Sequence, residues 1–97
     1  MRYEVVLAPG AVRDFKRLKA HVRSLVRDAI ELHLRHQPTR TSRSRIKRSR
    51  GLSRPEFRLR VDEVRVFYDV HGKTVEVLAL VPKSEAHAWL AEKGERT

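Results

Sequence analysis

The sequence has 97 residues, the size of one domain with a single modest core. Hydrophobic residues make up 40% of it and support a folded protein, whereas the net charge of +10 favours a polyanionic partner, first of all nucleic acid. An acidic protein and an anionic membrane surface are the alternative partners. The chain has no cysteine, which excludes disulfide bonds and thiolate metal sites.

The first predicted element is a strand at residues 2–8. Its apolar side chains fall on both faces, with Val5 on one side and Val6 on the other. We therefore expect a strand in the interior of a sheet rather than at its edge. Pro9-Gly10 ends this stretch, which is too short for a signal sequence or a membrane span. We expect a cytoplasmic protein with no membrane partner.

Helical periodicity follows over residues 11–36. The apolar stripe changes phase near residues 19–21, and this change predicts two helices, about 10–18 and 20–36, that form a hairpin. Gln37-Pro38 ends the second helix.

His33 and His36 lie three residues apart at the end of this second helix. No carboxylate or third imidazole stands at metal-ligand spacing from them. We interpret them as a pair at a helix end, and the sequence predicts no metal site.

Residues 39–54 show no periodicity and form a basic segment with six arginines, one lysine and no acidic residue. A charge block of this kind is typical of a mobile loop that contacts nucleic acid. A solvated loop or a disordered arm is the alternative.

Two alternating runs meet at Asp62-Glu63 within residues 57–70, and they predict a β-hairpin. A two-residue turn would pair Val61 with Val64 and Arg60 with Arg65. Asp-Glu is not a preferred pair for such a turn, so a longer or bulged turn is also possible. One face then carries the apolar side chains Phe57, Leu59, Val61, Val64, Val66, Tyr68 and Val70. The other carries Arg58, Arg60, Arg65 and Phe67.

Like charges directly opposite each other on a sheet are unfavourable. The arginine face of the hairpin is therefore either a solvated outer surface or a site for a polyanion. In the second interpretation, guanidinium groups bind phosphates and the Phe67 ring offers a surface on which a base can stack.

A third strand is predicted over residues 74–81. Simple alternation places Leu78 and Leu80 on the arginine face and keeps four side chains on the apolar face, namely Val75, Val77, Ala79 and Val81. Ser84 is the expected N-cap of a short last helix, which frays at residues 92–97.

The predicted order is strand, two-helix hairpin, three-strand meander and short C-terminal helix. This order indicates an α+β fold over residues 1–97, with a mostly antiparallel sheet of about four strands. The helical hairpin covers the apolar face, and the arginine face is left open.

With these elements in place, residues 3–91 resemble toxins of the RelE/ParE superfamily from bacterial and archaeal type II toxin–antitoxin modules. The most specific stretch is 57–68, Phe-Arg-Leu-Arg-Val-Asp-Glu-Val-Arg-Val-Phe-Tyr, which is similar to the family pattern Y-R-L-R-V-G-D-Y-R-V-I-Y. Residues 48–52 resemble the family's K-L-[KR]-G-L, and residues 77–80 and 83–90 resemble its last strand and tail.

The resemblance implies a RelE-like toxin that cleaves mRNA on the ribosome and so inhibits translation. Such an enzyme is an endoribonuclease that needs no metal and no cofactor, because the substrate's own 2′-hydroxyl is the nucleophile. The reaction requires a base near the 2′-oxygen, cations around the phosphate and an acid for the leaving 5′-oxygen. A fixed guanidinium suits the phosphate, on which charge builds in the transition state.

Carried over to this chain, the resemblance implies catalytic roles for Arg65 and for Lys83, the basic residue after the last strand. Lys47 and His87 are candidates for the base and the acid, and imidazole exchanges protons readily near neutral pH. The implied RNA-binding residues are Arg48, Arg50, Arg58, Arg60 and Trp89.

Two departures from the family pattern leave the acid and base open. Glu56 stands where a RelE enzyme can carry a catalytic lysine, although Glu56 could itself act as a base. Trp89 falls where these enzymes often carry a tyrosine, and it lacks the hydroxyl group. Packing of the last helix on the sheet is the alternative role for Trp89 and His87.

Two other functions fit the same resemblance: a ParE-type inhibitor of DNA gyrase, and a catalytically degenerate toxin that binds an antitoxin and operator DNA. All three imply a cognate antitoxin, expected to be acidic and partly disordered, and operator DNA bound through the toxin–antitoxin complex. We expect the antitoxin to cover the arginine face beside Leu78 and Leu80. For the nuclease, mRNA on the ribosome is a further partner.

Overall fold

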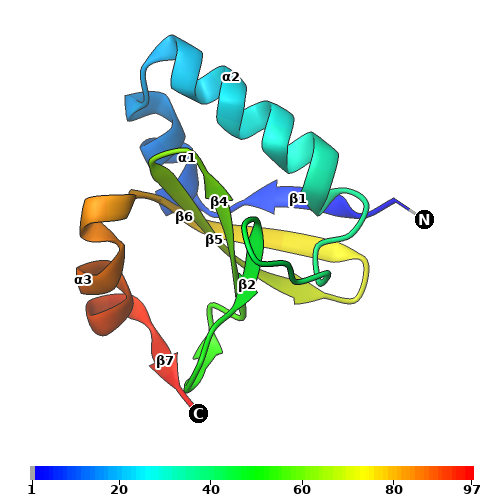
Figure 1. Cartoon of the computed structure of the whole chain (residues 1–97), viewed down its shortest axis with the longest axis vertical. Coiled ribbons are helices and arrows are strands. Elements are labelled where there is room, and N and C mark those ends of the chain that lie inside the picture. Colours follow the sequence, from blue (N-terminus) through cyan, green and yellow to red (C-terminus); the bar gives the residue numbers. More distant parts are fainter. Residues whose placement is uncertain (1) are drawn as a thin grey trace.

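The computed structural model describes residues 2–97, and its main feature is a five-stranded sheet with the order β1-β6-β5-β4-β2 (Figure 1). The first strand runs parallel to β6, and the other neighbours are antiparallel. The α+β fold is confirmed, with one strand more than expected. The five strands are β1 (Glu4–Leu7), β2 (Ile46–Arg48), β4 (Phe57–Val61), β5 (Val64–His71) and β6 (Thr74–Pro82).

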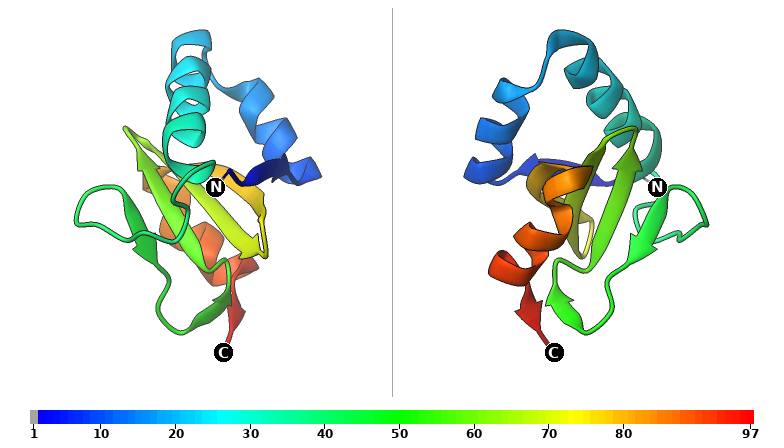
Figure 2. Two further views of the ribbon diagram at one scale, coloured as in Figure 1. Left: turned by 90° about the vertical axis from the view of Figure 1, so that its right-hand side faces the viewer. Right: turned by 60° about the vertical axis from the view of Figure 1, so that its left-hand side comes forward.

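The predicted helical hairpin consists of α1 (Pro9–Arg17) and α2 (Ala20–Ala29), and α2 continues as a π-helical segment η1 (Ile30–Leu34). The break falls at Leu18 and Lys19, whose backbone is extended. Both helices lie over one face of the sheet (Figures 1 and 2), where their apolar side chains join the main core. In the described part of the chain, no helix is both long and apolar enough to cross a membrane.

The β4–β5 hairpin has the predicted register, with Val61 opposite Val64 and Arg60 opposite Arg65. Asp62 adopts a φ of 53°, a conformation that aspartate tolerates better than most residues, and this allows the two-residue turn. On the core face, Tyr68 stacks against Phe57 with ring centroids 5.6 Å apart, and its hydroxyl donates to a backbone carbonyl of the loop after α2 at 2.6 Å. Burial raises the pKa of Tyr68.

The third strand of the meander departs from simple alternation. Phe67 lies opposite Ala79 but Tyr68 lies opposite Val77, so Leu78 is an extra residue that makes a β-bulge. After the bulge, each side chain lies on the face opposite to the one that simple alternation predicts. Leu80 is buried in the main core, and Ala79 and Val81 lie on the other face. The expectation that Leu80 is exposed on the arginine face was therefore wrong.

The strand β1 is an edge strand, and the expectation of an interior strand was wrong for this chain by itself. The basic segment also contains more order than predicted. Its residues 46–48 form β2, which extends the sheet beside β4, and its end forms β3 (Leu52–Arg54). These short strands form because each pairs with another strand. They contain too few residues for an alternating pattern to be visible in the sequence.

The last helix, α3 (Lys83–Lys93), starts one residue before Ser84, and Pro82 rather than Ser84 precedes its first turn. Ser84 makes no capping bond. The tail does not fray but forms β7 (Glu95–Arg96), which pairs with β3. This helix covers part of the sheet face that was expected to be open, on the side away from α2 (Figure 2).

Candidate functional site

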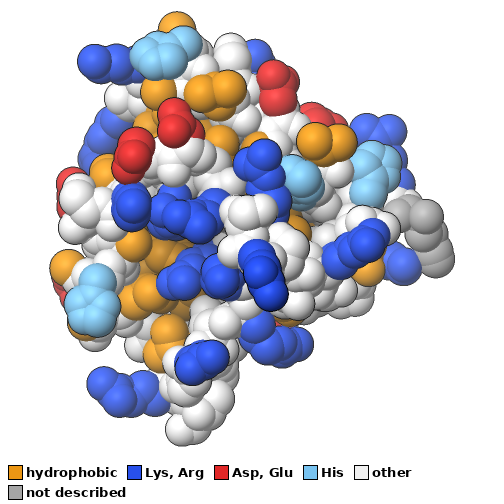
Figure 3. All heavy atoms as spheres, viewed as in Figure 1, with side chains coloured by type: hydrophobic (Ala, Val, Ile, Leu, Met, Phe, Trp, Pro, Cys, Tyr) orange, Lys and Arg blue, Asp and Glu red, His pale blue; other side chains and the backbone are white. Residues whose placement is uncertain are grey.

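A cavity of about 360 Å³ opens between the outer face of the sheet and α3. Figure 3 shows Lys and Arg side chains gathered over this part of the molecule, beside an apolar hollow. We call it the basic cavity, and its lining residues are Lys47, Arg58, Arg60, Arg65, Lys83, Ala86, His87 and Leu90.

One wall of the basic cavity is the sheet. Arg60 lies directly opposite Arg65 on β4 and β5, and Lys47 lies opposite Arg58 on β2 and β4. Cross-strand pairs of like charge destabilise a sheet. Within residues 2–97, no carboxylate lies within salt-bridge distance of any of these four side chains. The wall therefore presents uncompensated positive charge.

Arg65 is the best fixed of these cations. It is only 7% exposed, and its guanidinium donates to the backbone carbonyls of Asp62 at 2.9 Å and Val64 at 3.2 Å. Burial, and then the charge of Arg60, lowers the pKa of Arg65. A guanidinium remains protonated even so. Arg65 is thus a permanently charged donor held in one position at the floor of the cavity.

The other wall is α3. Lys83 and His87 are four residues apart, so they lie on the same face of the helix. The backbone N–H of Lys83 donates to the carbonyl of Glu63 at 2.7 Å, which ties the start of α3 to the hairpin turn. Trp89 stacks on Phe67 with ring centroids 4.8 Å apart and holds the helix against the sheet. The cavity therefore has two walls, each positioned by defined contacts.

Six of the nine predicted site residues meet in this cavity, namely Lys47, Arg58, Arg60, Arg65, Lys83 and His87. Arg48 and Arg50 do not line it. The guanidinium of Arg48 lies 4.9 Å from the centroid of the Phe57 ring, at the opposite face of the sheet. Arg50 is exposed between β2 and β3.

Trp89 makes the packing contact that was its alternative role, and it lines a different hollow between α1, β6 and α3. Phe67 is fully buried, so the ring predicted to stack on a base is not accessible. Ala86 and Leu90 line the cavity without having been predicted. Their spacing from Lys83, at three and seven residues along one helix face, was the available signal.

Carboxylates gather at the opposite end of the same sheet face. We call this group the acidic cluster; it consists of Glu56, Asp69 and Glu76, with the side chains of Arg54 and His71. Asp69, His71 and Glu76 offer metal-ligand atoms within 4.8 Å of one another. The guanidinium of Arg54 already contacts two of them, with Nε 3.0 Å from Asp69 Oδ2 and Nη2 3.3 Å from Glu76 Oε1.

Glu56 belongs to this cluster and does not line the basic cavity. Its carboxylate accepts a hydrogen bond from the backbone N–H of Val70 at 3.1 Å, and its own N–H donates to Asp69 at 2.8 Å. These bonds hold the start of β4 beside β5. A role for Glu56 as the base of a reaction in the basic cavity is not favoured by this position.

A family model described as the ParE toxin of type II toxin-antitoxin system, parDE, matches residues 5–87. The chain belongs to this toxin family. The predicted membership of the RelE/ParE superfamily is thereby confirmed. No match was found among curated protein sequences.

Solved structures of similar fold include several toxins in complex with antitoxins. The archaeal RelE–RelB complex from Pyrococcus horikoshii aligns with a TM-score of 0.70 and 21% identity, over 86% of this toxin and 97% of that chain. A RelBE complex from Mycobacterium tuberculosis aligns with a TM-score of 0.67 and 22% identity, over 84% of this toxin and 99% of that chain. The YoeB–YefM complex from Staphylococcus aureus aligns with a TM-score of 0.60 and 14% identity, over 82% of this toxin and 95% of that chain. At these identities the likeness is one of fold.

Proposed function

We propose that this toxin is an endoribonuclease that cleaves mRNA on the ribosome and so inhibits translation. The observation that carries the proposal is the basic cavity: five cations and one imidazole face each other across two walls, and no carboxylate lines the space. An RNA phosphodiester supplies the anionic charge that this arrangement lacks. The proposed reaction uses the 2′-hydroxyl of the substrate as nucleophile.

In this mechanism Arg65 binds the non-bridging oxygens of the scissile phosphate. Negative charge on these oxygens increases as phosphorus becomes five-coordinate, and a rigid guanidinium stabilises it without reorganising. The carbonyls of Asp62 and Val64 hold Arg65 before the substrate arrives. Arg60 lies directly across the strands and supports the same charge.

Two protons must move in the reaction. A base takes the proton of the 2′-hydroxyl, a bond forms between the 2′-oxygen and phosphorus, the bond to the 5′-oxygen breaks, and an acid protonates that oxygen. The products are a 2′,3′-cyclic phosphate and a 5′-hydroxyl. We assign one proton transfer to His87, the imidazole in the cavity, and the other to Lys83 or Lys47.

The remaining basic residues bind the RNA on either side of the cut. Arg58 lies next to Lys47 across the strands and contacts the neighbouring phosphate. Arg48 and Arg50 continue the positive charge past the edge strand β2 and hold the backbone farther away. Trp89 contributes indirectly, because its stack on Phe67 sets the distance between the two walls.

Primer extension on mRNA in a translating extract tests this proposal. We expect cuts within ribosome-bound codons from the wild type, and their loss with Arg65→Ala. Arg54→Ala is the matched control, because it removes an arginine from the acidic cluster at the other end of the same sheet face. Intact mRNA with the folded wild type would overturn the proposal.

Inhibition of DNA gyrase is the second candidate, and the ParE description of the matching family favours it. In that case the basic cavity is a binding surface rather than an active site. A supercoiling assay run beside the translation assay separates the two functions. Lost supercoiling with intact mRNA supports the gyrase inhibitor.

We also propose a cognate antitoxin as the protein partner, in the cytoplasm, and binding of operator DNA through the complex. The similar structures support this, since each is a toxin bound to its antitoxin. A net charge of +10 favours an acidic antitoxin.

A further inference from the structure

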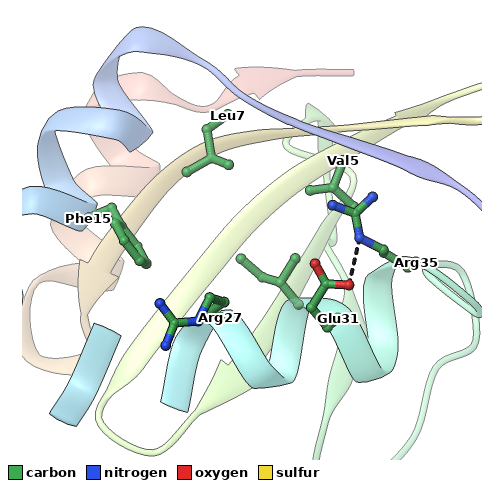
Figure 4. A pocket seen from close by; sticks show the side chains of 7 residues that line it. Val5, Leu7, Phe15, Arg27, Glu31 and Arg35 are labelled. Atoms are coloured by element: carbon green, nitrogen blue, oxygen red, sulfur yellow. Dashed lines mark hydrogen bonds and ion pairs between the residues drawn. The ribbon is translucent and has the colours of Figure 1, made fainter. Parts of the chain in front are cut away.

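The helix α3 is held less firmly than α2 and its continuation η1. In α2 and η1, three side chains are buried in the main core, namely Val26, Ile30 and Leu34. Figure 4 shows side chains of α2 and η1 pointing toward those of β1 across a pocket of about 240 Å³. Among the described residues of α3, no side chain is buried, although this helix carries Lys83 and His87 of the basic cavity. The position of α3 therefore depends on a small number of contacts.

Two of these contacts lie at the start and in the second half of α3. At the start, the Lys83 N–H donates to the carbonyl of Glu63 at the hairpin turn. Farther along, Trp89 stacks on Phe67. Neither contact holds the last turn of the helix, so a third one is needed to fix its C-terminal end.

The strands β3 and β7 supply this third contact. They pair antiparallel, with Leu52 opposite Arg96, and the Ser53 hydroxyl donates to the carbonyl of Glu95 at 3.2 Å. We call this pair of strands the clasp, and Figure 2 shows it at the end of α3. The clasp joins the chain after α3 to the chain after β2, the strand that carries Lys47 of the other cavity wall.

Two glycines make the clasp possible. Gly51, between β2 and β3, has a φ of 69°, a conformation that glycine adopts without strain, and its carbonyl accepts the N–H of Thr97 at 3.3 Å. Gly94 follows α3, and a Cβ atom there would lie 2.5 Å from the carbonyl oxygen of Leu90 and 3.2 Å from the Leu52 side chain. A side chain at position 94 would therefore force the chain away from β3.

The clasp reaches the basic cavity through the last turns of α3. Gly94 donates its N–H to the carbonyl of Leu90 at 2.9 Å, and Leu90 lines the cavity together with His87. With a rise of about 1.5 Å per residue, His87 lies roughly 10 Å from Gly94 along the helix. A displacement of the C-terminal end of α3 therefore moves this imidazole. The arginines of the cavity lie on the sheet wall and do not depend on the clasp.

We infer that the clasp is a positioning element for His87 and that it depends on Gly94. A closed clasp holds the imidazole across the cavity from Arg65, where the proposed proton transfer occurs. An isolated pair of short strands is only marginally stable in water, so one substitution is enough to open it. An open clasp leaves the sheet wall, and with it RNA binding, unchanged. This inference rests on the proposed RNA cleavage and adds to it a requirement that lies outside the cavity.

Tryptophan fluorescence tests the clasp without reference to cleavage. Trp89 is the single tryptophan of the chain, so acrylamide quenching reports how closely α3 packs on the sheet. We expect Gly94→Ala to raise the quenching constant at least about twofold, because the last turns of α3 lose their hold. Gly10→Ala is the matched control, because a Cβ atom there lies 3.6 Å from the Leu78 carbonyl oxygen, an ordinary contact. Equal quenching in the two folded variants would overturn the inference, whether or not the toxin cleaves RNA.

Cleavage kinetics on programmed ribosomes test the connection to His87. We expect Gly94→Ala to lower kcat at least about tenfold, because a displaced group transfers its proton poorly. KM should stay within about twofold of the wild type, because the arginines of the sheet wall keep their positions. A higher KM with unchanged kcat would overturn the inference, since the clasp would then belong to the RNA-binding surface. Intact RNA with the wild type would instead overturn the proposed function, and the quenching result would still decide whether the clasp holds α3.

A double-mutant cycle shows whether the clasp acts through His87. In the His87→Gln background, Gly94→Ala should lower kcat by less than about twofold, because no imidazole remains to be positioned. A further loss of about tenfold in the double variant would overturn the inference, because independent effects add in this way.

A disulfide across the clasp is the opposite perturbation. Leu52→Cys combined with Arg96→Cys places two thiols on directly opposite residues, in a chain that has no other cysteine. We expect the oxidised form to cleave within about twofold of the wild-type kcat, because the closed clasp is the active arrangement. The same variant under reducing conditions is the control. Loss of cleavage on oxidation, restored by reduction, would overturn the inference, because it would mean that the clasp must open.

Discussion

The acidic cluster and the basic cavity lie at the two ends of the outer sheet face, and each contains one buried charged side chain. The two charges differ in the partners that surround them. Asp69 is 3% exposed, and the guanidinium of Arg54 and the N–H of Glu56 satisfy its two oxygens. Arg65 is 7% exposed, and it is held only by neutral carbonyls and faces further cations. Within residues 2–97, these are the two charged side chains that are buried.

This difference separates a structural site from a binding site. A buried charge with an internal partner stabilises its own surroundings, and its removal changes stability. A buried charge without a partner destabilises the free protein and is retained where an external ligand supplies the opposite charge. Substitutions at the acidic cluster should therefore change stability, whereas substitutions at the basic cavity should change activity.

The largest effect is expected from His87→Gln, because general acid or base catalysis contributes about 10²–10⁴ in rate. RNA cleavage should decrease by about this factor while the melting temperature stays the same. The measurement is primer extension over a time course, with His36→Gln as the control, because His36 is exposed and does not line the basic cavity. A decrease of less than tenfold would assign proton transfer to the lysines instead.

Arg60→Glu would give Arg65 an internal carboxylate partner, as Arg54 is for Asp69 in the acidic cluster. The new carboxylate would lie opposite Arg65 and neutralise its charge, so cleavage should decrease by about 100-fold. The same change replaces a repulsive cross-strand pair with an attractive one and should stabilise the fold by about 0.5 kcal/mol. Urea denaturation measures the second effect, with Arg13→Glu on α1 as the charge-matched control. Lower stability together with normal cleavage would contradict the comparison.

Asp69→Ala tests the acidic end. The Glu56 N–H loses its acceptor and Arg54 loses its partner, so the free energy of unfolding should decrease by about 2 kcal/mol. Cleavage measured well below the new melting temperature should stay within about twofold of the wild type. Loss of cleavage by a fully folded variant would show that the two ends are coupled.

The smallest effect concerns pH. Burial raises the pKa of Asp69 above its ordinary value of 3.8, against the opposing influence of the Glu56 N–H and Arg54. The folded state then binds this proton more tightly than the unfolded state. Its contribution to stability is full below pH 3.8 and is lost as pH rises through the raised pKa. The difference in unfolding free energy between wild type and Asp69→Asn should decrease over this range in urea titrations; an increase would contradict the assignment.

The hairpin could be predicted in detail because one face of it is purely apolar over seven positions. A shift of one residue would bury Arg58, Arg60 and Arg65, so the pattern specifies the register. The same alternation brought the arginines to one face. Lys83 joined them in the prediction through the family resemblance, and His87 as a nearby imidazole suited to proton transfer.

The strand β6 was predicted less well because its second half is apolar on both faces. The residues Leu78, Ala79, Leu80 and Val81 fit the core and the α3 contact equally well in either register. The bulge at Leu78 decides between them, and nothing in the alternation marks it. The position of Trp89 depended on this choice, since its stacking partner Phe67 lies opposite Ala79.

The bulge at Leu78 has a consequence for how this gene tolerates mutation. An in-frame deletion of this one codon would leave a shorter strand with unbroken alternation. Residues 79–82 would keep their faces, because Ala79 would follow Val77 directly and still lie opposite Phe67, with Leu80 opposite Val66 in the core. The strand should therefore tolerate the loss of one residue at this point better than elsewhere along its length. In alignments with other family members, a gap at position 78 leaves unchanged which side chains of β6 belong to the core.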